Sequence, residues 1–305
     1  INSVISEIRD IALTIPGAIY REACDQAKFG MVLDEFSERK IDLLVIIAGD
    51  GTVHAVLSYM LSTQIFSPQP NLAIIPAGTT NMTAKDFKAH GKPLRLMGRL
   101  AKLLIDNSNY ASTSRPVLRI QNADEIPRYG MFFGVGLIAD GVKYFQERVK
   151  GLAITGEKAS GVVLLRFFYY LMLGRRDVES LKARTHIQMN ECIGTDENPL
   201  LVFATSLDRL LLGMRPYWGT QEDKMHVTLV QNRPKRFWRS ILPLVTGRGA
   251  GLAEEDGYHS DNLSSLTLSL TGDYIIDGEI YTASKEKGKV HISAKDSISV
   301  MELNN

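Results

Sequence analysis

Residues 42–47, DLLVII, are apolar after the first position and lead directly into the turn AGDGT at 48–52. A continuous apolar run is typical of a strand that is covered on both faces in a parallel sheet. The turn precedes a predicted helix over about residues 53–61, and a second apolar run at 71–76 ends in another glycine turn, AGTTN. Further helices are expected over residues 27–38 and 93–105. This alternation predicts a layered α/β domain with a parallel sheet.

From about residue 115 the pattern changes to short runs, several of which alternate apolar and polar residues. Such alternation indicates antiparallel strands with one buried face. The runs are PVLRIQ, YGMFFGVG, ARTHIQM, LLVFATSL, MHVTLVQ, LSSLTLSL, DYIIDGEIY, KVHISA and SISVM, with helices expected at roughly 139–150, 156–173 and 234–246. We expect an α/β domain over residues 1–112 and a β-rich sandwich over residues 113–305, whose last strands could pack back on the first domain.

Composition and charge exclude several classes of protein. The formal net charge of +1 gives no reason to expect nucleic acid as a partner. Cys24 and Cys192 are too far apart in sequence to indicate a disulfide framework or a zinc site. No signal peptide is visible in the opening residues, INSVISEIRD, and a cytoplasmic location is expected. The sequence leaves the oligomeric state undetermined, with a homodimer as one possibility.

The two glycine turns are candidates for binding phosphate. Ligands of parallel sheets sit at the carboxyl ends of strands, and glycines let a backbone approach a phosphate at a helix N-terminus. Thr52 and Thr79 add hydroxyl groups and Asn81 adds an amide. Asp50 is unusual there, because a carboxylate repels phosphate unless a metal or a proton transfer is involved. Neither turn matches the Walker or the dinucleotide-binding pattern, so a purely structural turn is the alternative.

A third motif makes the pattern more specific. Asp277-Gly278-Glu279 lies in YIIDGEIY, near the end of the chain. Together, AGDGT, PAGTTNMTAKDF and DGE resemble the diacylglycerol kinase catalytic family, which includes bacterial lipid kinases, sphingosine kinases and ceramide kinases. The wider superfamily of NAD kinases and phosphofructokinases shares the GGDGT loop. The three motifs occur in the family's order and span most of the chain.

The resemblance implies a role for each motif. In the family, the first two loops bind ATP in the cleft between the domains, and Mg²⁺ accompanies the nucleotide. The nucleotide-binding positions carried over are Ala48, Gly49, Asp50, Gly51, Thr52, Gly78, Thr79 and Asn81. The DGE motif supplies the general base, for which Asp277 and Glu279 are both candidates, while Asp50 would assist by orienting Mg²⁺ through water. A solvated hairpin turn is the structural alternative for DGE.

The sequence also departs from the family pattern. Ala48 replaces the first glycine of GGDGT, and His54-Ala55 replace the usual Asn-Glu, with His54 expected on the helix surface or in the cleft. Met82 and Lys85 replace an aspartate and an arginine of the second loop. The family's opening NPxSG phosphate loop is not found.

An accessory Mg²⁺ site of the bacterial lipid kinases has a partial counterpart here. Their D-G-L-L-D segment corresponds to QEDKMHV at residues 221–227. Glu222 would replace an aspartate that binds the metal, but Asp223 stands in place of the glycine. The resemblance therefore implies Glu222 as a metal ligand, with the rest of the site incomplete.

Two segments are candidates for contact with a lipid. GVVLLRFFYYLMLGRR at 161–176 is an apolar stretch too short to span a bilayer, and RPKRFWRSILPLVTGRG at 233–249 surrounds an apolar run with five basic residues. Each fits a peripheral membrane surface or, alternatively, a helix packed in the core. The expected activity is ATP- and Mg²⁺-dependent phosphorylation of a lipid alcohol. The alternatives are an NAD kinase-like enzyme and an inactive nucleotide-binding regulatory protein.

Overall fold

The chain forms two compact units. The computed structural model describes residues 2–23, 26–149, 185–190, 194–197, 199–252, 254–283 and 288–303. One unit comprises residues 1–115 together with 297–305, and the other comprises residues 116–296. The sequence placed its boundary three residues earlier, at 112, and allowed the last strands to return to the first domain.

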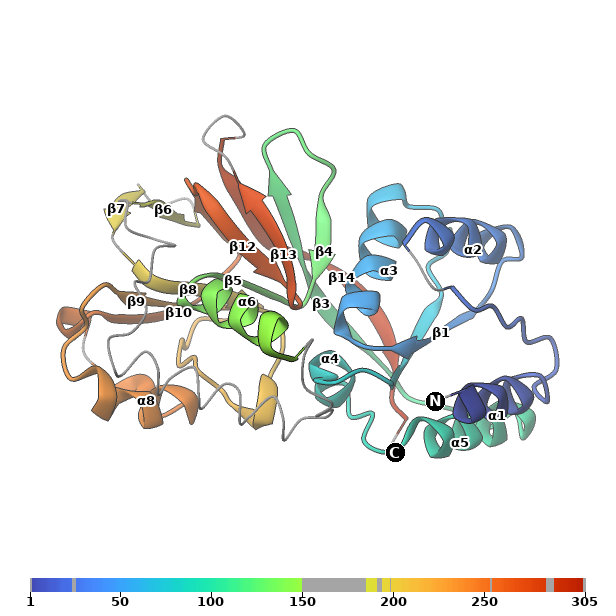
Figure 1. Ribbon diagram of the computed structural model, residues 1–305. Helices are drawn as coiled ribbons and strands as arrows, with labels where there is room; N and C mark the ends of the chain where they lie inside the picture. The colour runs from blue at the N-terminus through green and yellow to red at the C-terminus, as the bar shows by residue number, and fades with distance from the viewer. Residues whose placement is uncertain are drawn as a thin grey trace. The chain divides into compact units, whose positions relative to one another are not determined.

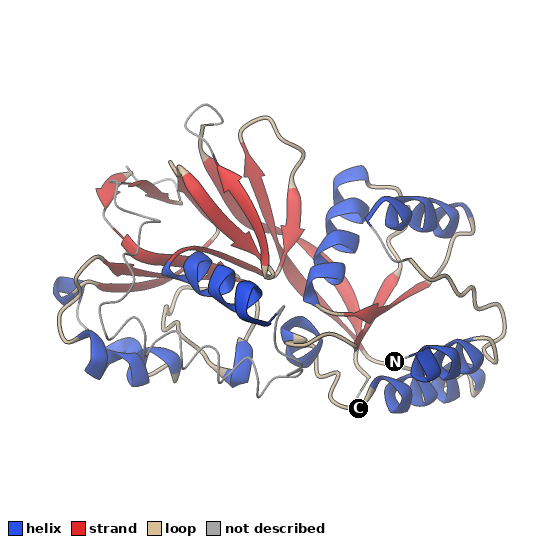
Figure 2. Ribbon diagram, viewed as in Figure 1, coloured by secondary structure: helices blue, strands red, loops and turns tan. Residues whose placement is uncertain are grey.

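The first unit is a layered α/β domain (Figures 1 and 2). Its elements are α1 (Asn2–Ala12), α2 (Gln26–Glu38), β1 (Leu43–Ala48), α3 (Asp50–Thr63), β2 (Asn71–Pro76), α4 (Met82–Asp86), α5 (Pro93–Ile105) and the end of β14 (Val290–Met301). Strands β1 and β2 pair in parallel, and Val300 of β14 pairs in parallel with Leu72. Helices α1 and α5 pack side by side. The predicted α/β class with a parallel sheet is confirmed.

The second unit is built from antiparallel strands. They are β3 (Ser112–Asn122, whose first residues belong to the first unit), β4 (Arg128–Gly130), β5 (Phe132–Gly136), β6 (Thr185–Met189), β7 (Thr195–Glu197), β8 (Pro199–Thr205), β9 (Met225–Gln231), β10 (Tyr258–Leu263), β11 (Ser265–Leu268), β12 (Gly272–Ile276), β13 (Glu279–Ala283) and the start of β14. Helices α6 (Leu137–Val149) and α8 (Phe237–Val245) and the short helices η1 (Leu211–Gly213), η2 (Gly249–Gly251) and η3 (Glu254–Asp256) lie between strands.

Two sheets enclose the core of this unit. One has the order β10-β9-β8-β5-β12-β13, and the other joins β14 to β11, β11 to β6 and β6 to β7, with β3 pairing β14 and β4. One buried cluster takes side chains from both sheets, such as Phe133 and Val202 from the first and Leu266 and Ile292 from the second. Because the inner faces of both sheets share one apolar core, the predicted β-rich sandwich is confirmed.

Several elements differ from their prediction. Helix α3 begins at Asp50 instead of residue 53, so the first glycine turn is itself the start of the helix. YGMFFGVG divides at Met131 into β4 and β5, whereas KVHISA and SISVM join in the single strand β14. Four elements were not predicted from the sequence: α1, α4, β7 and β10. The helix expected at 156–173 and the apolar segment 161–176 lie outside the described residues.

Among the helices of the described residues, none is long and apolar enough to cross a bilayer.

Candidate active site

The first glycine turn begins a helix. Gly49 is the N-cap residue of α3, with extended backbone angles of φ −92° and ψ 175°. Its carbonyl oxygen accepts hydrogen bonds from the amides of Thr52 and Val53, both at 3.1 Å. The first N–H groups of a helix lack carbonyl partners within it, and the helix dipole adds positive charge there. AGDGT therefore presents an end of a 14-residue helix that suits an anion.

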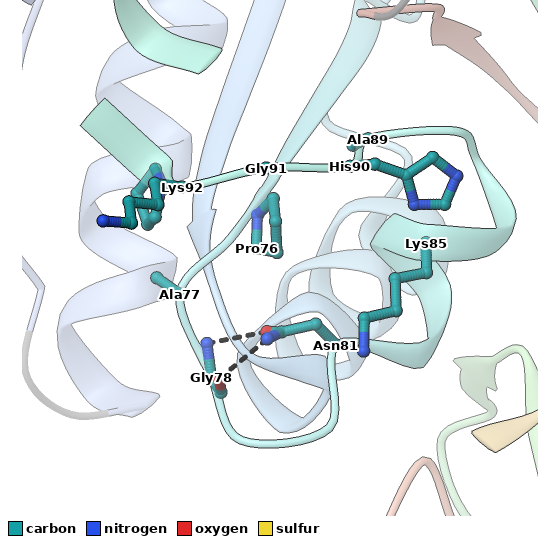
Figure 3. A pocket seen from close by; sticks show the side chains of 10 residues that line it. Pro76, Ala77, Gly78, Asn81, Lys85, Ala89, His90, Gly91 and Lys92 are labelled. Atoms are coloured by element: carbon teal, nitrogen blue, oxygen red, sulfur yellow. Dashed lines mark hydrogen bonds between the residues drawn. The ribbon is translucent and has the colours of Figure 1, made fainter. Parts of the chain in front are cut away.

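The second turn is closed by Asn81. This residue has a left-handed backbone, with φ 49°, at the N-cap of α4. Its Oδ1 accepts a hydrogen bond from the Gly78 amide and its Nδ2 donates to the Gly78 carbonyl, both at 2.7 Å (Figure 3). The Asn81 side chain therefore fixes the shape of the loop, while Thr79 is exposed at its tip.

Asp50 joins the two turns. Its side chain is buried, and one oxygen, Oδ2, accepts hydrogen bonds from the Thr80 hydroxyl at 2.7 Å and the Met82 amide at 2.9 Å. The other, Oδ1, accepts from the Thr83 amide at 3.0 Å. The carboxylate thus binds the first amides of α4, which follows the loop after the neighbouring strand β2. From the sequence, Asp50 was expected to orient Mg²⁺ through water; the structure shows that it positions the second turn.

The glycines of the two turns are required by packing. A Cβ atom at Gly78 would lie 2.4 Å from the Cα of Gly49, and one at Gly49 would lie 3.0 Å from the Cα of Gly78. The two backbones therefore touch at these positions, where no other residue fits without displacing a loop. This contact was not visible in the sequence, because it depends on β1 and β2 being neighbours.

A pocket of about 490 Å³ opens beside the second turn (Figure 3). It is lined by Pro76, Ala77, Gly78, Asn81, Lys85, Ala89, His90, Gly91, Lys92 and Pro93. The side chain of Lys85 extends toward Asn81, and His90 and Lys92 are exposed. Lys85 and Lys92 give the pocket a positive charge that suits phosphate. The sequence had singled out Lys85 only as a replacement for arginine.

The second unit carries the DGE motif on a tight hairpin. Asp277 and Gly278, with φ 48° and 90°, form a two-residue loop between β12 and β13, and Ile276 pairs with Glu279. Positive φ at both loop positions is the type I′ geometry that Asp-Gly favours. The motif is therefore a hairpin turn, as its structural alternative proposed. Its aspartate, however, is buried instead of solvated.

Asp277 holds the hairpin against β4 and β5. Its carboxylate accepts hydrogen bonds from the Met131 amide at 3.0 Å and the Phe132 amide at 2.9 Å, and its own amide donates to the Phe132 carbonyl at 3.0 Å. These bonds explain why β4 and β5 separate at Met131, whose amide binds a carboxylate. A Cβ atom at Gly130 would lie 2.5 Å from Asp277 Oδ2, so the approach requires glycine. Glu279 is exposed and makes no hydrogen bond or ion pair within the described residues.

Helix α6 supports the same hairpin from a second side. Lys143 forms an ion pair with Asp273 at the start of β12, and Gln146 Nε2 donates to the Gly278 carbonyl at 3.0 Å. Burial works to raise the pKa of Asp273, but the hydrogen bonds from Lys143 and Thr282 outweigh it and hold that pKa below its ordinary value. The turn is therefore fixed by its own sheet and by α6.

Replacing Lys143 with methionine should raise the pKa of Asp273. A depressed carboxyl pKa stabilises the folded state above the unfolded pKa, about 3.9, and the contribution is lost as pH falls through the lower folded value. The Lys143→Met protein should therefore lose stability at neutral pH and lose less of it on acidification than the parent does. NMR titration of the Asp273 carboxyl group and unfolding between pH 2 and 7 would measure this. Lys289→Met, at an exposed lysine, is the control, and an unchanged Asp273 pKa in Lys143→Met would contradict the assignment.

Two further residues singled out by sequence lie elsewhere. Glu222 is exposed, and the described part of the chain contains no group of three His, Cys, Asp or Glu side chains that could hold a metal. Its role as a metal ligand stays a prediction. His54 is 2% exposed inside α3, so the expectation of a surface or cleft position is wrong.

Comparison with known proteins gives a match to one family model and similarity to several solved structures. Residues 20–111 match the model of the diacylglycerol kinase catalytic domain. Two structures of a proposed diacylglycerol kinase from Bacillus anthracis str. Sterne are similar, with TM-scores of 0.66 and 0.63 at 15% and 16% identity. The alignments cover 99% and 98% of this chain and 90% and 91% of those chains. A diacylglycerol kinase structure from the same organism has a TM-score of 0.59 at 15% identity, covering 99% and 91%. Comparison with curated proteins gives no match.

The fold and the two paired glycine turns define a kinase-like α/β domain followed by a β-sandwich. Residues 20–111 match the diacylglycerol kinase catalytic domain, which confirms the resemblance inferred from the motifs. At these identities, the solved structures establish the shared fold over nearly the whole chain.

Proposed function

We propose that the chain is an ATP-dependent kinase that phosphorylates the hydroxyl group of a lipid alcohol. The observation that carries the proposal is the contrast between two carboxylates of one hairpin. Asp277 is buried and bound to backbone amides, whereas Glu279, two residues on, is exposed and unpaired within the described residues. An enzyme that transfers a phosphoryl group to an alcohol needs an available carboxylate to accept the proton of that alcohol.

ATP would bind at the two glycine turns. The first N–H groups of α3 and the ammonium group of Lys85 would donate hydrogen bonds to the phosphate oxygens of ATP. Thr52, partly exposed in the first turn of α3, and Thr79, at the tip of the second turn, would add hydroxyl donors. Asp50 and Asn81 would keep the two turns in register, because their side chains already bind backbone groups of the second turn.

The described residues do not offer a set of ligands that would hold a magnesium ion directly at Asp50, and contact through water stays a prediction. Both oxygens of that carboxylate already accept hydrogen bonds from the second turn, and no group of three candidate ligands occurs in the described ranges. Mg²⁺ prefers phosphate oxygens and water with one or two carboxylates. An ion needed for the reaction would therefore enter with the nucleotide.

Glu279 would act as the general base. Its carboxylate accepts the proton of the lipid hydroxyl, the hydroxyl oxygen forms a bond to the γ-phosphorus of ATP, and the bond from that phosphorus to the β-phosphate oxygen breaks to release ADP. Asp277 does not touch the substrate in this assignment. It holds the hairpin through Met131 and Phe132 and so determines where Glu279 stands.

Transfer of label from radioactive ATP, with Mg²⁺ present, is the direct test. The acceptors would be diacylglycerol, sphingoid bases and ceramide in mixed micelles, with NAD in a parallel reaction. A labelled lipid is expected, and it would identify the substrate. Label in NAD alone would instead assign the NAD kinase-like activity. ATP binding without transfer to any acceptor would favour the regulatory alternative and contradict the proposal.

A further inference from the structure

Helix α8 exposes the side chains that a surface helix normally buries. Trp238 and Leu242, one turn apart on the same face, are 47% and 69% exposed. Ser240 and Leu244 on the opposite face are buried, and Leu244 packs with Val230 and Tyr258 in a small apolar cluster. The hydroxyl-bearing Ser240 thus faces the protein, while Trp238 and Leu242 face the solvent. The helix therefore carries apolar side chains on its outer face as well, where an ordinary surface helix is polar.

Basic side chains surround the exposed face. The flanking segment contributes Arg233, Lys235, Arg236, Arg239 and Arg248, all exposed, and residues 233–249 contain no acidic residue. Lys235 pairs with Asp256 at 3.3 Å. The four arginines make no side-chain hydrogen bond or ion pair within the described residues. In the neighbouring η3, Asp256 pairs with Lys235 and Glu254 with His259, while Glu255 forms no ion pair within the described residues.

A second exposed leucine adjoins the end of this helix. The amide of Arg215 donates to the carbonyl of Val245, the last residue of α8, at 2.9 Å, which holds the loop around η1 against it. Leu212 in that loop is 53% exposed and has a left-handed backbone, with φ 57°. Non-glycine residues adopt this conformation at an energetic cost, and such strain concentrates at functional positions.

We propose that α8 binds the surface of an anionic lipid bilayer. Trp238 and Leu242 insert at the boundary between headgroups and acyl chains, where an amphipathic indole ring is most favourable. Arg233, Arg236, Arg239 and Arg248 contact lipid phosphates at the rim. Apolar burial combined with attraction between arginine and anionic lipid is the chemistry of interfacial helices. This surface would bring the kinase proposed above to the bilayer that holds its substrate, and that purpose rests on the proposed function.

Vesicle co-sedimentation of the full chain tests the proposal. Vesicles of phosphatidylcholine alone are compared with vesicles that also contain phosphatidylglycerol, and the mixed vesicles should bind the chain more tightly, with affinity falling as salt rises. Arg236→Gln/Arg239→Gln should weaken binding roughly 25-fold, since each arginine near an anionic surface contributes about fivefold. Trp238→Ser/Leu242→Ser should weaken it at least roughly tenfold. Equal binding to both vesicles, or no binding by the parent, would overturn the proposal.

Matched controls separate a local effect from a general one. Ile126→Ser removes a residue that is 76% exposed in another loop of the same unit, and Arg95→Gln/Lys102→Gln removes two exposed charges from α5. Both should bind like the parent. Weakening equal to that of the α8 variants would overturn the assignment. Self-association that the Trp238→Ser/Leu242→Ser variant abolishes, without vesicle binding by the parent, would assign the face to a second copy of the chain.

Tryptophan emission adds a readout that is specific to α8. The chain has two tryptophans, and Trp218 is packed so closely that a Cβ atom at Gly249 would lie 2.1 Å from its ring. Brominated lipids should quench the parent's emission on binding and leave that of Trp238→Phe, which retains an apolar anchor, nearly unquenched. Equal quenching in both would contradict insertion of α8. Transfer of label to a water-soluble short-chain acceptor should persist in every α8 variant, so a failure of lipid binding and a failure of the kinase activity are distinguishable.

Discussion

The Glu279→Gln protein should bind ATP normally and transfer its phosphoryl group roughly 10²–10⁴ times more slowly, the usual contribution of a general base. Glutamine keeps the size of the side chain but cannot accept a proton at neutral pH. Because Glu279 is exposed and makes no hydrogen bond within the described residues, the substitution should leave the thermal unfolding temperature unchanged. Single-turnover rates, ATP affinity and the unfolding temperature measure the three expectations.

The matched variant is Asp277→Asn, which lies on the same hairpin. Its carboxylate accepts bonds from two buried backbone amides, so loss of the charge should lower the free energy of unfolding by about 2 kcal/mol. For a protein of 305 residues, the unfolding temperature should fall by roughly 3 °C. Activity should fall as well, because the hairpin that carries Glu279 loosens. If Asp277→Asn instead lost transfer with full stability while Glu279→Gln stayed active, the roles of the two carboxylates would be reversed.

Replacing Gly78 with alanine should separate the two glycine turns. The added Cβ atom would lie 2.4 Å from the Cα of Gly49 and 3.1 Å from the Asn81 amide oxygen, and both obstacles are parts of the loops themselves. Overpacking of this kind costs about 1–3 kcal/mol, and the shifted loop should weaken ATP binding by at least about tenfold. Calorimetric unfolding and titration with ATP would measure both effects.

Gly98→Ala provides a control in the same unit, because it should raise the stability that Gly78→Ala lowers. Gly98 lies inside α5, and a Cβ atom there would meet nothing within 4 Å. Alanine is favoured over glycine in a helix interior by roughly 1 kcal/mol, so this variant should be more stable than the parent and bind ATP equally well. Equal stability and ATP affinity of Gly78→Ala and the parent would show that the two turns do not need their close contact.

Local patterns were sufficient to predict most elements of the fold. The apolar runs of β1 and β2 lie within one residue of their predicted bounds, and α5 begins and ends where predicted. These elements follow from periodicity, which neighbouring residues determine. The sequence failed at β4 and β5, because the break at Met131 depends on a carboxylate 146 residues later in the chain. It also missed α4, a five-residue helix whose cap, Asp50, comes from another element.

The sequence by itself determined the kind of chemistry: three motifs in a fixed order, with glycines beside threonines and a late pair of carboxylates. Tertiary structure decided what each residue does within them. Asp50 became a link between two turns because parallel pairing of β1 and β2 brings their ends together. Asp277 became a buried anchor, and Glu279 an exposed carboxylate, because the hairpin lies beside Met131 and Phe132. The burial and the hydrogen-bond partners of these side chains depend on contacts between distant segments, which a three-residue motif does not specify.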